Sequence, residues 1–96
     1  MMLKVGKLYI CEEYFLMLYP DQETATDARV GHDDAARVGS AATAYWSKRF
    51  GKPVLFSEKN VPLLPLNNKE KYVEVLAGDR KGWIICEDWL NIKEIV

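Results

Sequence analysis

The sequence is poor in the side chains that most often build a metal or redox site. Its 96 residues include one histidine, His32, and two cysteines, Cys11 and Cys86, that are far apart in the chain. A single histidine excludes the two-histidine zinc motifs, and two thiols without a Cys-x-x-Cys spacing are typical of buried apolar residues in a reducing compartment. We therefore expect no metal, no cofactor and a cytoplasmic protein.

Long apolar runs and an excess of one charge are also missing. The longest apolar run, residues 14–20, is far shorter than the roughly 20 residues of a membrane span, and lysines at positions 4 and 7 interrupt the N-terminus where a secretory signal needs an apolar core. Thirteen basic and fourteen acidic side chains give a net charge of −1, which is not the footprint of a general nucleic-acid binder. With 49% hydrophobic residues, the composition predicts one soluble folded domain over residues 1–96 and no membrane partner.

Patterns that carry catalysis are lacking as well. No serine lies in a Gly-x-Ser-x-Gly elbow, and the Gly78 to Gly82 segment has neither the Gly-Lys-Ser/Thr sequence nor the following helix of a phosphate-binding loop. His32, Asp33 and Asp34 are accounted for as the start of a helix, where carboxylates cap the free backbone N–H groups. We expect no catalytic residues and no enzyme.

The sequence does contain short β-forming segments on either side of one helical segment. From Ala35 to Trp46, small and apolar residues recur at helical spacing; Lys48 and Arg49 follow, and Gly51 occupies the position of a helix-ending glycine. These signals predict one helix over about residues 33–50, within an insertion over 24–52. Strands are expected at residues 3–11, 14–19, 54–56, 61–66, 71–77, 83–86 and 91–96.

Prolines and glycines refine these strands. Pro62 and Pro65 predict that residues 61–66 form an edge strand or an irregular one, because proline cannot donate to a ladder. Asn67-Asn68 is expected to form a turn, and Gly78 to Gly82 a tight hairpin connection. Between them, strand alternation puts one set of side chains on one face (Val73, Val75 and Ala77) and another set on the other (Tyr72, Glu74 and Leu76).

The segment from Pro62 to Ile95 resembles the C-terminal half of SH3-like barrels, bacterial ones in particular. The likeness rests on the strand Tyr72-Val73-Glu74-Val75, the hairpin Gly78 to Gly82 and the strand start Gly82-Trp83-Ile84. It implies a mainly β fold: a small SH3-like barrel of five to six short strands, formed by residues 3–23 and 53–96, with the helical insertion between them. The whole chain is also similar to small uncharacterised proteins of cyanobacterial phages, a likeness that implies no activity.

The resemblance places Tyr72, Ile85 and Trp89 where SH3 domains have the aromatic, proline and tyrosine positions of their ligand groove. The three tryptophans are more than so small a core requires, and Trp46 follows Tyr45, so the two diverge by about 100° around the helix. Aromatic side chains are favoured anchors of interfaces. The first hypothesis is therefore a non-enzymatic protein-interaction or accessory module with an apolar-aromatic patch, whose partner is an unknown protein or a second copy of the chain.

The second hypothesis is a small barrel that binds single-stranded nucleic acid. Its candidate residues combine rings for base stacking with cations for phosphate, at the end of the expected helix: Tyr45, Trp46, Lys48, Arg49 and Lys52. The helix macrodipole also favours cations at that end and carboxylates at the start, so the same pattern is explained without a ligand.

Overall fold

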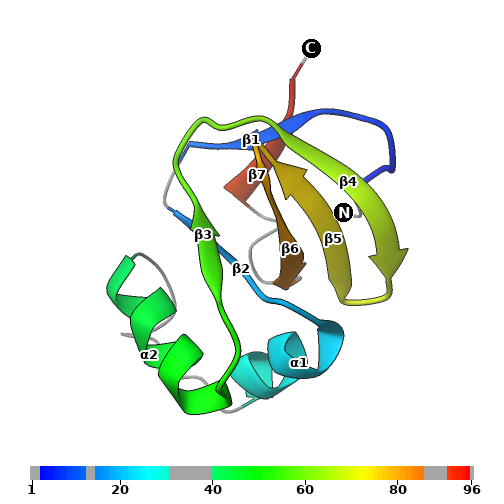
Figure 1. Ribbon diagram of the computed structural model, residues 1–96. Helices are drawn as coiled ribbons and strands as arrows, with labels where there is room; N and C mark the ends of the chain where they lie inside the picture. Colours follow the sequence, from blue (N-terminus) through cyan, green and yellow to red (C-terminus); the bar gives the residue numbers. More distant parts are fainter. Residues whose placement is uncertain (1–2, 13–14, 31–39, 86–90, 96) are drawn as a thin grey trace.

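The computed structural model describes residues 3–12, 15–30, 40–85 and 91–95, with only the backbone for 29–30, 40–43 and 46. The described residues form a mainly β structure with two helices (Figure 1). In chain order the elements are β1 (Tyr9–Cys11), β2 (Leu16–Leu18), α1 (Gln22–Val30), α2 (Ser40–Phe50), β3 (Leu55–Ser57), β4 (Leu63–Lys69), β5 (Tyr72–Ala77), β6 (Arg80–Ile85) and β7 (Ile92–Glu94).

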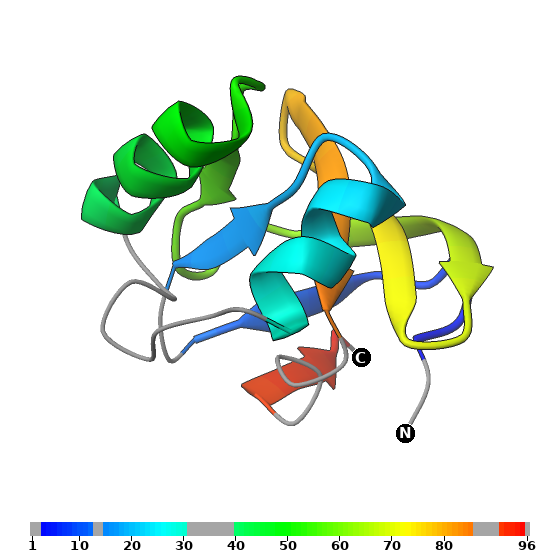
Figure 2. The same ribbon diagram turned by 90° about the horizontal axis from the view of Figure 1, so that it is seen from below.

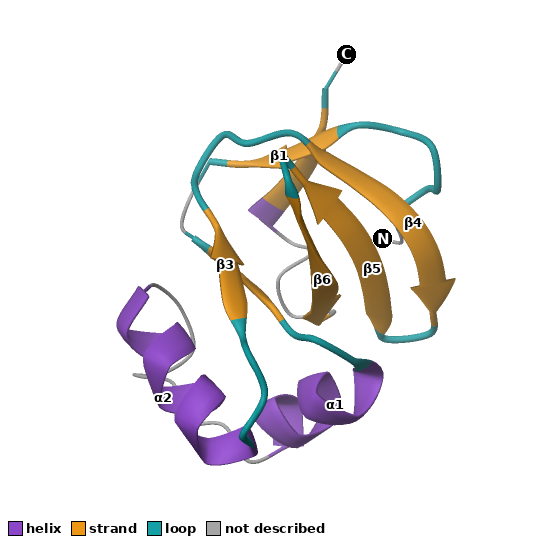
Figure 3. Cartoon of the chain, in the orientation of Figure 1, coloured by secondary structure: helices purple, strands orange, loops and turns teal. Residues whose placement is uncertain are grey.

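The described strands form two antiparallel sheets. One has five strands in the order β6-β5-β4-β1-β7, and the other pairs β2 with β3 (Figure 3). The sheets meet where Tyr19 and Trp83 exchange backbone hydrogen bonds of 2.9 and 2.8 Å, and the Asn60 N–H donates to the Cys11 carbonyl at 2.9 Å. These contacts join the sheets at single points, so the described strands do not form one continuous closed barrel.

Strand β4 departs from the expected edge strand. It lies inside the five-stranded sheet, with β1 on one side and β5 on the other. The register shifts between Pro65 and Asn67, so the expected irregularity is present, and this bulge lets the sheet accommodate a residue without an N–H. The predicted turn at Asn67-Asn68 is wrong: both residues pair with β5, and the chain reverses at residues 70–71, where Glu70 has a φ of 49°.

The expected single helix is also wrong, because the insertion contains two. Helix α1 begins after Asp21, whose Oδ1 accepts the Thr24 N–H at 2.7 Å, as an N-cap does. Helix α2 covers the second part of the expected 33–50 range and ends as predicted at Gly51, whose φ is +67° and whose N–H donates to the Ser47 carbonyl at 3.0 Å. Residues 33–39, and the expected cap at 32–34, lie outside the described residues.

Two clusters of buried side chains hold the elements together. The first lies inside the strands and draws on six of them, with Leu18, Leu63, Val75 and Ile84 among its members. The second lies on the outer side of β6 and includes Met17, Tyr19, Ala25, Ala28, Val54, Trp83 and Ile85. Helix α1 covers β6 there, while α2 lies beside β3 (Figure 2).

Strand β2 separates the two clusters. Alternate side chains of an extended strand point to opposite sides, so Leu16 and Leu18 enter the first cluster and Met17 and Tyr19 the second. All four are 1% exposed. Cys11 is likewise buried, as the sequence predicts, whereas Cys86 lies outside the described residues.

Candidate functional site

Two of the predicted SH3-type groove positions, Tyr72 and Ile85, belong to the cluster that helix α1 covers. Tyr72 and Ile85 are brought together as register partners on β5 and β6. Ile85 is only 3% exposed and belongs to the second cluster, and the half-buried Tyr72 packs against it. The Ile85 side chain is therefore a core residue rather than part of an accessible patch. Trp89 lies outside the described residues, and for Trp46 only its place in α2 is described.

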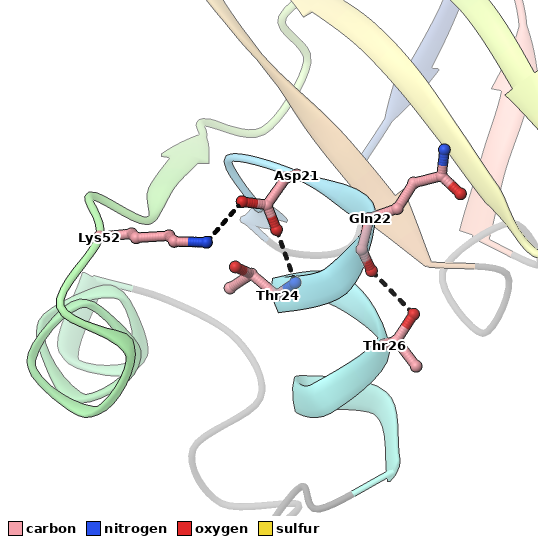
Figure 4. Close-up of polar contacts among 5 residues, drawn as sticks. All are labelled: Asp21, Gln22, Thr24, Thr26 and Lys52. Atoms are coloured by element: carbon pink, nitrogen blue, oxygen red, sulfur yellow. Dashed lines mark hydrogen bonds and ion pairs between the residues drawn. The ribbon is translucent and has the colours of Figure 1, made fainter.

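Three of the predicted nucleic-acid-binding residues do lie together. Tyr45, Lys48 and Arg49 are exposed on α2 and line one shallow depression. Lys52 is engaged elsewhere: its Nζ lies 2.9 Å from Oδ2 of Asp21 (Figure 4). The pKa of Lys52 is raised chiefly by its hydrogen bond with Asp21, and the charges of Glu23 and Asp27 on α1 raise it further.

Asp21 links the two helices. One carboxylate oxygen accepts the Thr24 N–H and the other accepts a hydrogen bond from Lys52 (Figure 4). Chiefly the Thr24 hydrogen bond, and then the one from Lys52, lowers the pKa of Asp21 from 3.8 to about 2. The same pairing raises the pKa of Lys52. This arrangement accounts for Lys52 as a structural residue.

A surface that sequence analysis did not single out lies on the outer face of the five-stranded sheet. Leu64 and Leu76 are register partners on β4 and β5. Tyr9 and Leu63 are partners in antiparallel strands, so Leu8, one residue before Tyr9, lies next to Leu64, one residue after Leu63. On its other side, the Leu8 carbonyl accepts the Ile95 N–H at 2.9 Å. Paired residues of antiparallel strands share a face, so Ile95, Leu8, Leu64 and Leu76 form one row across four strands.

This row, which we call the apolar row, is accessible. Leu8 is 46% exposed, Ile95 40% and Leu76 37%, whereas Leu64 between them is half-buried. Leu66, 39% exposed at the bulge of β4, lies close beside it. Scattered apolar residues are normal on a surface, but a contiguous group on neighbouring strands marks a place where contact with another molecule removes apolar surface from water.

One signal in the sequence does point to this surface. A strand with one face in water normally alternates apolar and polar residues, whereas Leu63 to Leu66 is apolar throughout and Leu76 follows Val75 directly. Sequence analysis placed Leu76 on the face opposite Val73 and Val75, and the structure confirms that placement. What it could not supply was the strand order that sets Leu8 and Ile95 beside it.

A groove of about 260 Å³ lies at the turn between β5 and β6 and is lined by Phe56, Ser57, Glu58, Val61, Ala77, Gly78, Asp79 and Arg80. The Arg80 Nη1 donates to the Phe56 carbonyl at 2.9 Å, and its guanidinium carbon lies 5.4 Å from the centre of the Phe56 ring. This volume is below the usual range of small-molecule sites, and Arg80 is already bound to β3. We assign the contact a structural role.

The part of the chain that the structure describes contains no group of three or more His, Cys, Asp or Glu side chains that could hold a metal ion. Within those residues there is also no helix long and apolar enough to cross a membrane.

Comparison of the chain with protein-family models, with curated proteins and with solved structures gave no match in any of the three.

Proposed function

We propose that this chain is a non-enzymatic protein-interaction module and that the apolar row on the outer face of the sheet is its docking surface. The observation that carries the proposal is that Ile95, Leu8, Leu64 and Leu76 lie in or directly beside four adjacent strands and that three of them are more than a third exposed. Covering the remaining surface of one such side chain, on the order of 80 Å², contributes roughly 2 kcal/mol. The row as a whole can support a moderate affinity.

We further infer that the strands belong to an SH3-like barrel, as the resemblance of residues 62–95 implies. Support comes from the first cluster, whose side chains come from β1, β2, β4, β5, β6 and β7, and from the hydrogen bonds between Tyr19 and Trp83 that join the two sheets. In this barrel the docking surface is not the usual groove, because α1 lies over the position of Ile85.

Site-specific photo-crosslinking tests the proposed docking surface. A photoreactive amino acid at Leu76, in the cells that express the protein, is expected to give a discrete adduct that mass spectrometry identifies, and Leu8→Ser in the same chain is expected to abolish it. The matched control is Leu55, a leucine of similar exposure (39%) on β3 of the other sheet. An absence of adducts at Leu76, or the same adducts at Leu55, contradicts the proposal.

The second candidate is binding of single-stranded nucleic acid, which is favoured by one observation. Tyr45, Lys48 and Arg49 are exposed together on α2, and a ring beside two cations suits a stacked base and its phosphates. A salt titration of binding to single-stranded DNA and RNA tests it. No measurable affinity at low salt removes this candidate, since phosphate contacts are strongest there.

A further inference from the structure

A cluster of lysines lies at one end of the sheet that carries the apolar row. The Asn68 Nδ2 donates to the Leu3 carbonyl at 2.8 Å, and the Gly6 N–H donates to the Pro65 carbonyl at 3.3 Å. These bonds hold the N-terminal segment against β4, next to the turn between β4 and β5. Each of the two segments contributes two exposed lysines to what we call the basic end: Lys4, Lys7, Lys69 and Lys71.

Among the described residues, no carboxylate neutralises the lysines of the basic end. Three of the five other lysines have carboxylate partners: Lys52 pairs with Asp21, Lys93 with Glu12 at 3.0 Å, and Lys81 lies 4.0 Å from Glu74. No carboxylate within ion-pair distance is found for Lys4, Lys7, Lys69 or Lys71 in the described residues, and Glu70 is the one acid among them in their two segments.

The basic end borders the apolar row along the chain. Lys7 directly precedes Leu8, and Lys69 ends the strand that carries Leu64 and Leu66. In antiparallel pairing, the residues before Leu8 and those after Leu64 run toward the same end of the sheet. All four lysines therefore lie beyond the same side of the row, which gives the face an apolar strip with a positive margin.

We propose that the partner at this face is an acidic protein segment, with apolar side chains that cover the apolar row and carboxylates that face the basic end. This inference rests on the proposed docking function and adds the chemistry of the partner. Opposite charge raises the rate of encounter and rejects partners of like charge, while the apolar contact provides the affinity. Seven of the fourteen acids of this chain lie between residues 12 and 34 of the sequence, and Glu70 is the one acid within the two segments that carry the four lysines.

A protein segment suits the face better than an anionic membrane does. The apolar row runs from β5 past β4 and β1 to the end of β7 instead of lying on a single loop. The Glu74 carboxylate is half-buried on the same face of β5 as Leu76, and its ion pair with the exposed Lys81 is long, at 4.0 Å, so it would meet lipid phosphates of its own sign. A polypeptide can place a donor or a cation opposite Glu74, whereas a uniform anionic surface cannot.

Binding of three fluorescent peptides to the full chain tests the proposal by anisotropy. One is an amphipathic leucine/glutamate peptide, one its leucine/lysine counterpart, and one a serine/glutamate peptide without apolar residues. We expect the leucine/glutamate peptide to bind about tenfold or more tightly than either other peptide. Its affinity is expected to fall severalfold as ionic strength rises from about 0.02 to about 0.3 M, where the Debye length shrinks from roughly 20 to roughly 6 Å.

Matched variants separate the two parts of the proposal. The double variant Lys7→Ser with Lys69→Ser is expected to remove the preference for glutamate, whereas Lys48→Ser with Lys59→Ser, which changes the net charge equally, leaves it intact. Leu8→Ser weakens the leucine/glutamate peptide severalfold, whereas Leu55→Ser does not. Chemical shifts of the bound protein are expected to change along the apolar row and at the basic end.

Each other outcome overturns a defined part. If the leucine/lysine peptide binds as tightly as the leucine/glutamate peptide, the proposal of an acidic partner is wrong, and the proposed docking surface is unaffected. If neither leucine-containing peptide binds and the photoreactive residue at Leu76 also gives no crosslink, both the acidic partner and the proposed docking function are contradicted. Lysine-dependent binding to vesicles that contain phosphatidylserine, without peptide binding, assigns the face to a membrane. Dimerisation by light scattering that Leu8→Ser abolishes assigns it to a second copy of the chain.

Discussion

Gly82 is the residue at which the smallest chemical change is expected to have the largest structural effect. It lies in β6 opposite Val75 and faces β2. A Cβ atom placed on Gly82 would lie 2.6 Å from the Cβ of Leu18, 2.9 Å from its carbonyl carbon and 3.0 Å from its Cα. Two of these three atoms belong to the backbone, so no rotation of the Leu18 side chain relieves the overlap, and β2 itself must move away from β6.

The cost of Gly82→Ala follows from this displacement. Forcing an extra methyl group into a packed core costs about 1–3 kcal/mol. Moving β2 also weakens the two hydrogen bonds between Tyr19 and Trp83, each with a net contribution of about 1 kcal/mol. We expect Gly82→Ala to reduce the free energy of unfolding by about 3–4 kcal/mol, a large part of the stability of a domain of this size.

Urea unfolding followed by tryptophan fluorescence measures this loss, and hydrogen exchange at the Tyr19 and Trp83 amides locates it. Gly6→Ala is the control, because Gly6 has a φ of +86° but no atom within 4 Å of the added Cβ. It should cost about 1 kcal/mol through the backbone alone, without faster exchange at the two amides. If Gly82→Ala is no less stable than Gly6→Ala, or the two amides stay protected, the close packing of β2 on β6 is refuted.

Three further changes test other contacts. Asp21 has a pKa of about 2 in the folded chain, so its contribution to stability is present above pH 3.8 and is lost as the pH falls toward 2. Because its side chain is 40% exposed, we expect urea titrations over this acid range to show a loss of about 1 kcal/mol in the free energy of unfolding. Asp21→Asn should abolish this pH dependence while keeping the cap, whereas Asp21→Ala should cost about 1 kcal/mol more through loss of the cap; an unchanged profile in Asp21→Asn contradicts the assignment. Ala25→Leu should lower the free energy of unfolding, measured by thermal unfolding, by about 1–3 kcal/mol, because the larger side chain lifts α1 off β6. Asp27 is exposed on the same helix, so Asp27→Leu should have no such effect. Equal effects of the two changes would show that α1 does not pack on β6 through Ala25. Arg80→Lys should cost about 0.5–1.5 kcal/mol in urea unfolding, because lysine lacks the planar guanidinium that bonds β3 and stacks on its ring; wild-type stability would mean that this contact is not formed in solution.

The mainly β class and several local features could be predicted because their signals are local. The alternation of Val73, Val75 and Ala77 fixes which face of β5 is buried, and Gly51 ends α2 where a left-handed residue is required. The prolines were harder to interpret. A proline in a strand argues for an edge, but Pro65 lies next to a bulge in an interior strand, and only the pairing with β5 reveals that bulge.

Helix α1 escaped prediction because its apolar face is made of small residues. Ala25 and Ala28 are the apolar side chains that it buries, beside the buried Thr24, and Thr24 and Thr26 lower its intrinsic helix propensity. Its stability comes instead from the cap at Asp21 and from packing on Trp83, which is distant in sequence. A small residue facing a large ring leaves no periodic pattern of large apolar residues in the helix itself.

The position of α1 also explains why the apolar row, rather than the SH3-type groove, is the docking surface we propose. The outer side of the five-stranded sheet carries apolar residues at both of its ends: Trp83 and Ile85 on β6, and the apolar row from β5 to β7. The inserted helix covers the first group, and Trp83 is left only 8% exposed. In the described part of the chain no element covers Leu8, Leu76 or Ile95, which remain 37–46% exposed. Among the described residues, the same outer face is thus closed by the chain's own helix over β6 and left open beside the four lysines of the basic end, where opposite charge can bring in a partner from outside.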